Sequence, residues 1–136
     1  MNTVLHLRIA GALLLALAAF NAVLPRYFGW RAELQKVSLL TRQIFFVHAF
    51  FIALVLVFFG TLSILGAEEL ARPSFLSRAV LAGFAIFWGL RLVVQLFVYD
   101  SSLWRGDRFR TAMHGLFTCL WAYLAAVYGG AWLLHA

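Results

Sequence analysis

Two histidines, His48 and His114, stand within long apolar runs of the sequence. Two neutral imidazoles at a similar depth on two helices can ligate one haem iron, with nearby arginines holding the propionates. Nothing in the spacing turns the two rings toward each other, and hydrogen bonding between helices is the commoner use of such histidines. We therefore predict no metal site and no cofactor, and keep haem b on His48 and His114 as an alternative.

Arg91 stands inside a third apolar run and is followed at helical spacing by Gln95 and Tyr99, then by Asp100. Its guanidinium stays charged and carries five donors, so inside a membrane it must meet acceptors. The interpretation that we favour slightly makes Arg91 a structural link between helices. A second makes it the anchor of an anionic ligand, and a third places it at an interface with another subunit. Asp100 can act as a general base, but a helix cap or a loop salt bridge is its commoner role.

The polar side chains of all four apolar runs fall at comparable depths, given the helical rise of about 1.5 Å per residue. On the last run, His114 and Thr118 share a helix face that Trp121 continues. We predict one polar pocket open to the cytoplasm, with His48, Arg91, Gln95 and His114 facing the interior. No catalytic residue is assigned. The candidate ligand-binding residues are Asn21, Arg42, His48, Arg91, Gln95, Tyr99, Asp100, His114 and Thr118.

A weak internal repeat joins the second and fourth apolar runs. Arg42 and His48 recur as Arg108 and His114 with the same spacing. Duplication would give a parallel repeat about an axis along the membrane normal. Chance composition accounts for the match equally well, so both explanations stay open.

The elements that must position these side chains are four apolar stretches, at residues 4–24, 39–65, 75–99 and 111–134. Each reaches the roughly 20 residues that a helix needs to cross about 30 Å of hydrocarbon, and helices satisfy their own backbone groups in lipid. The chain is 65% hydrophobic and 12% charged, far from a soluble composition. We predict an all-α integral membrane protein, a four-helix transmembrane bundle forming one domain over residues 1–136.

Local signals refine this prediction. The first stretch is interpreted as a retained helix rather than a signal peptide, and Pro25 is expected to end it. Gly11, Gly83 and Gly89 are expected to allow close approach between helices. His6 is expected to be solvated. The single cysteine, Cys119, excludes a disulfide within the chain.

Basic residues predict the orientation, because the cytoplasmic links of membrane proteins carry an excess of arginine and lysine. The first and third links with their flanks hold Arg26, Arg31, Lys36, Arg42, Arg105, Arg108 and Arg110. The N-terminus and the second link hold Arg8, Arg72 and Arg78. Both termini are therefore predicted on the non-cytoplasmic side. The net charge of +6 indicates this orientation and anionic lipids rather than nucleic acid, and the preference for arginine over lysine suggests a bacterial inner membrane.

The sequence has no nucleophile elbow, phosphate-binding loop or paired carboxylates, which favours a non-enzymatic membrane module. Such a module would bind a lipid or a small anionic ligand in the pocket, or serve as an accessory subunit of a larger complex. Membrane lipids, a homo-oligomer or a membrane complex are the expected partners. Three alternatives stay open: a b-type haem electron-transfer subunit, a membrane enzyme acting on a lipid headgroup through His48, His114 or Asp100, and an oligomeric transporter or channel.

Overall fold

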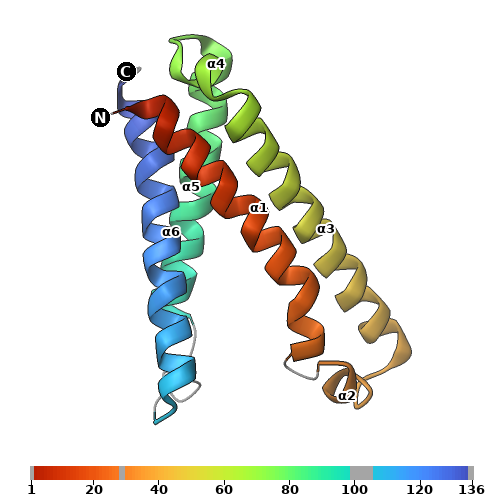
Figure 1. The fold of residues 1–136 in the computed structure, drawn as a ribbon. Helices are drawn as coiled ribbons and strands as arrows, with labels where there is room; N and C mark the ends of the chain where they lie inside the picture. Colours follow the sequence, from red (N-terminus) through yellow and green to blue (C-terminus); the bar gives the residue numbers. More distant parts are fainter. Residues whose placement is uncertain (1, 28–29, 99–105, 135–136) are drawn as a thin grey trace. The chain divides into compact units, whose positions relative to one another are not determined.

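A computed structural model describes residues 2–27, 30–98 and 106–134, and within these ranges the chain is helical, with no strand. Figure 1 shows the helices in chain order. The long helices are α1 (Thr3–Tyr27), α3 (Leu39–Leu65), α5 (Phe75–Phe97) and α6 (Arg108–Leu134). The short helices are α2 (Trp30–Leu34) and α4 (Ala67–Ala71), which lie in the first and second links.

All four long helices are long and apolar enough to cross a membrane. This confirms the predicted all-α class and the four apolar helices, and α3 begins and ends at the predicted residues. Many large side chains on these helices are exposed, Phe50 and Phe58 of α3 among them. Contact of such an apolar surface with lipid is favourable, whereas its contact with water is unfavourable. The assembly of one bundle, its single domain and the side of the termini stay predictions.

α1 continues through Pro25 to Tyr27, which corrects the expectation that Pro25 ends this helix. Proline lacks its own backbone N–H, so the carbonyl of Asn21, four residues earlier, loses one helical hydrogen bond. Later residues keep their donors, and the helix can therefore continue. In the same turn, the Asn21 side chain donates from Nδ2 to the carbonyl of Leu17 at 2.9 Å.

Serines fix the starts of α3 and α5. The backbone N–H of Thr41 donates to Ser38 Oγ at 3.2 Å. At α5, the N–H of Ser77 donates to Ser74 Oγ at 3.0 Å, and the N–H of Ser74 donates to Ser77 Oγ at 3.1 Å. These bonds pair donors that the first turn of a helix otherwise leaves unmet, so both helices have a defined beginning.

The chain divides by its contacts into two compact units, and the first comprises Leu7–Ala67. Within it α1 and α3 meet at two glycines. A Cβ on Gly11 would lie 2.7 Å from the carbonyl oxygen of Gly60, and a Cβ on Gly60 would lie 2.9 Å from that of Gly11. The backbones thus approach with no room for a side chain. The expectation for Gly11 is confirmed, whereas Gly83 and Gly89 do not bring α5 close to α6 within their own unit, because a Cβ there would meet no described atom within 4 Å.

The second unit comprises Met1–His6 and Glu68–Ala136. In it α5 and α6 run antiparallel and pack side by side (Figure 1). Aromatic rings from both helices form the contact: Phe84 meets Tyr128 edge-on with the centroids 5.0 Å apart, and Tyr128 is fully buried. This unit is therefore held by large rings rather than by close backbones.

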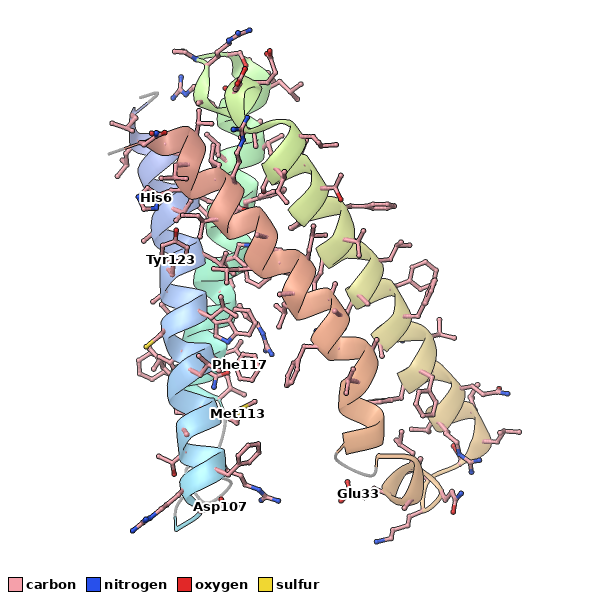
Figure 2. The ribbon with its side chains drawn as sticks, in the orientation of Figure 1. His6, Glu33, Asp107, Met113, Phe117 and Tyr123 are labelled. Carbon is pink, nitrogen blue, oxygen red and sulfur yellow. The ribbon has the colours of Figure 1, made fainter. Side chains whose placement is uncertain are left out.

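The N-terminal residues of the second unit are tied to α6. His6 Nδ1 lies 3.0 Å from the hydroxyl of Tyr123, and the two side chains approach each other in Figure 2. His6 is half-buried. The expectation that it is solvated is therefore wrong, because the phenol provides a hydrogen-bond partner within the fold.

Candidate binding site on α5 and α6

Gln95 joins α5 to α6 through its side-chain amide and is only 7% exposed. Its Oε1 lies 3.4 Å from Trp121 Nε1, and its Nε2 lies 2.8 Å from His114 Nδ1. An indole N–H can only donate a hydrogen bond. The amide oxygen therefore faces Trp121, and the amide NH₂ faces His114.

This amide orientation determines which nitrogen of His114 carries hydrogen. Nδ1 accepts from Gln95, so the neutral imidazole carries its hydrogen on Nε2. Moving it to Nδ1 would require the amide to reverse, which would turn its NH₂ toward the N–H of Trp121. The neighbouring Thr118 hydroxyl donates to the carbonyl of His114 at 2.7 Å and so bonds its own helix. The network thus holds His114 in one tautomer.

Trp121 is the centre of a stack of three rings. Trp88 of α5 lies nearly parallel to it, with the centroids 5.3 Å apart and an angle of 10°. Phe117 of α6, labelled in Figure 2, lies 5.6 Å away at 18°. Such pairs contribute about 0.5–1.5 kcal/mol beyond their buried area. Stacking and the Gln95 hydrogen bond together fix the Trp121 ring.

The indole N–H of Trp88 has no hydrogen-bond partner among the described residues. The side chain is only 2% exposed. A buried donor left unpaired costs about 1–3 kcal/mol, and the hydrocarbon core of a membrane offers no water to compensate. α5 therefore presents one unmet donor, three residues before Arg91.

Arg91 lies over the fixed ring, with its Cζ 5.2 Å from the centroid of Trp121. This separation is within the range of a cation–π interaction, which contributes about 0.5–2 kcal/mol. Arg91 is half-buried. The N–H groups of a guanidinium lie in its own plane, where the oxygens of a phosphate or carboxylate can bind in pairs. The site thus holds a permanent positive charge within a helix that is long and apolar enough to cross a membrane.

Three other predicted pocket residues, Asn21, Arg42 and His48, belong to the first unit, and each bonds a backbone carbonyl there. Besides the Asn21 bond, Arg42 Nε donates to the Leu34 carbonyl at 3.3 Å, and His48 Nδ1 lies 2.8 Å from the Ile44 carbonyl. A carbonyl only accepts, so His48 carries hydrogen on Nδ1 and keeps a lone pair on Nε2. His48 is exposed, whereas Arg42 is half-buried.

The structure brings together four of the predicted residues, which are Arg91, Gln95, His114 and Thr118. Tyr99 and Asp100 lie outside the described residues. Trp121 continues the predicted face of α6, but the contribution of Trp88 was missed. The available signal was spacing, because Trp88 precedes Arg91 by three residues and Gln95 by seven, on the same helix face.

Haem ligation would require a particular hydrogen-bonding pattern of each histidine. Within its own unit, only one of the two histidines has this pattern. A metal-binding histidine uses one nitrogen lone pair and usually donates its other N–H to an acceptor. His48 has this arrangement, whereas the Nδ1 lone pair of His114 is turned to Gln95. The haem alternative stays a prediction that would require the Gln95 amide to reverse. Over residues 2–27, 30–98 and 106–134, no three His, Cys, Asp or Glu side chains gather as a metal site.

Comparison of the chain with protein-family models, with curated proteins and with solved structures found no match.

Proposed function

We propose that this protein is a non-enzymatic membrane module that binds the anionic group of a lipid, or a small anion, at Arg91. The observation that carries the proposal is the position of Arg91 over Trp121, at 5.2 Å from the ring centroid. Gln95 supplies hydrogen bonds between α5 and α6, so the helices are linked without relying on the guanidinium. An anion bound to the guanidinium would form charge-assisted hydrogen bonds with it.

In the proposed orientation, the anion reaches Arg91 from the cytoplasmic side of the membrane. We propose that the links between α1 and α3 and between α5 and α6 face the cytoplasm, with both termini on the other side of a bacterial inner membrane. The distribution of basic residues supports this. Arg91 then lies about 9 Å from the cytoplasmic end of α5, six residues away at the helical rise.

Site-directed labelling tests the orientation. In a Cys119→Ala background, Ser101→Cys should react with a membrane-impermeant thiol reagent only after the cytoplasmic side is opened. Ala71→Cys should react in intact cells. Labelling of Ser101→Cys from outside intact cells would refute the orientation.

Thermal stability in detergent tests the anion site. Wild type should gain stability from phosphatidylglycerol but not from phosphatidylcholine, by about 2.7 kcal/mol when the lipid stands at 100 times its Kd. Arg91→Leu should fold and lose this gain, and Arg91→Lys should keep part of it, because lysine retains the charge without the planar fork.

Two controls sharpen this measurement. Arg110→Leu removes one exposed charge from the first turn of α6, where Arg110 pairs with Asp107 at 3.5 Å, and it should keep the full gain. Inorganic phosphate in place of lipid separates a free anion from a headgroup. A full gain in Arg91→Leu would disprove the proposed function.

A further inference from the structure

Two donors of different chemistry lie against the same indole ring on α5 and α6. Trp88 stacks on Trp121 at 5.3 Å, and Arg91 lies over Trp121 at 5.2 Å, so both side chains lie beside one ring. They are three residues apart on α5, which separates them by about 4.5 Å along the helix axis. One donor is a permanent cation and the other is a neutral N–H that is buried and unmet among the described residues.

The two donors favour different acceptors. A guanidinium binds the paired oxygens of an anion, whereas a single neutral indole N–H matches one neutral oxygen, such as a carbonyl. A ligand that bonds both must carry an anionic group and, a few bonds away, a neutral oxygen acceptor. A free phosphate lacks the second group, and a fatty acid offers only its carboxylate.

A glycerophospholipid with ester-linked acyl chains carries these two groups in the required order. Its phosphate lies nearer the membrane surface, and its ester carbonyls follow a few bonds deeper. In the proposed orientation α5 has the same order, because Arg91 is nearer the cytoplasm than Trp88. An arginine at this depth draws headgroups and water inward by thinning the bilayer locally, which lets a phosphate reach it.

We propose that the site binds an ester-linked anionic glycerophospholipid, with the phosphate on Arg91 and an ester carbonyl accepting from Trp88 Nε1. This inference rests on the proposed function and adds the lipid class. It assigns Trp88 the role of distinguishing ester from ether linkages. An ether linkage has no carbonyl oxygen, and its bridging oxygen is a poorer acceptor for the indole N–H.

The test compares two lipids that differ only in this linkage. The binding of diester and diether phosphatidylglycerol with matched chains is measured in mixed micelles containing the full-length protein. Wild type should bind the diester form about 5-fold more tightly, as expected for one neutral hydrogen bond. Trp88→Phe should bind both forms equally while still preferring phosphatidylglycerol to phosphatidylcholine.

Because Trp88 also packs in the core, a second variant keeps the ring. Trp88→benzothienylalanine replaces the indole N–H by sulfur and preserves the bicyclic stack on Trp121. It should lose the ester preference as Trp88→Phe does. Trp132→Phe, which removes another indole of α6, is the matched control and should keep the preference.

The outcomes separate the two proposals. Equal binding of the diester and diether lipids by wild type, or an unchanged ester preference in both Trp88 variants, overturns the assignment of the ester and leaves the anion site standing. Unchanged phosphatidylglycerol binding in Arg91→Leu overturns the anion site, and the ester assignment with it.

Discussion

The two units of the molecule join their helices in opposite ways. In the unit Leu7–Ala67, backbones meet at Gly11 and Gly60, where no side chain fits. In the unit that holds α5 and α6, aromatic rings stack, and Gln95 bonds two side chains of the facing helix. Small residues bring membrane helices close through van der Waals contact, whereas polar side chains link them at particular points. Side chains between helices can therefore form a site, which a contact between backbones does not.

The two repeated histidines also differ between the units, because one bonds within its own helix and the other bonds to a neighbouring helix. His48 and His114 each follow an arginine by six positions. The ring of His48 bonds the carbonyl of Ile44 in its own helix, and the ring of His114 bonds Gln95 of the neighbouring helix. The partner helix, and not the local motif, decides the role of each histidine.

The largest expected effect is at the glycine contact. Gly60→Leu should destabilise the protein by about 3 kcal/mol, because overpacking a close contact forces the backbones apart. Gly83→Leu should be near neutral, since its Cβ position is open. Unfolding by sodium dodecyl sulfate from mixed micelles measures both. Equal losses would show that the glycine contact does not hold the first unit together.

A smaller effect is expected for the polar link between α5 and α6. Gln95→Leu should cost about 1–3 kcal/mol, because it leaves the Trp121 N–H and a His114 nitrogen without their partner. A double-mutant cycle with His114→Ala should give a coupling of about 0.6–1.7 kcal/mol. The same cycle between Asn21→Leu and His48→Ala serves as the control. If the coupling energy between Asn21 and His48 equals that between Gln95 and His114, the two units do not differ in how side chains link their helices.

The smallest effect is expected at His48. His48→Ala should change stability by less than about 0.5 kcal/mol, because the side chain is exposed and bonds only its own helix. Nitrogen NMR of the two imidazoles gives a sharper comparison, with hydrogen on Nδ1 in His48 and on Nε2 in His114. Finding the same tautomer in both rings would contradict the Gln95 geometry.

The long helices were predictable because their signal is local. A run of apolar residues long enough to cross a membrane must form a helix whatever surrounds it. The common face of Arg91 and Gln95 follows from helical periodicity alone. The sequence could not distinguish Gly11 from Gly83, because the two glycines differ only in which atoms of a neighbouring helix lie beside them. The link from Gln95 to His114, and the position of Trp88, depend on helix rotation, which periodicity leaves undetermined.

The hydrogen bond between His6 and Tyr123 can form only late in the synthesis of this protein. The two residues are 117 positions apart, and ribosomes add about 5–20 residues per second. Tyr123 is therefore made roughly 6 to 23 s after His6, when Gly11 and Gly60 have both long been made. His6 must wait for Tyr123, so a nascent chain that stops before α6 leaves His6 without this partner.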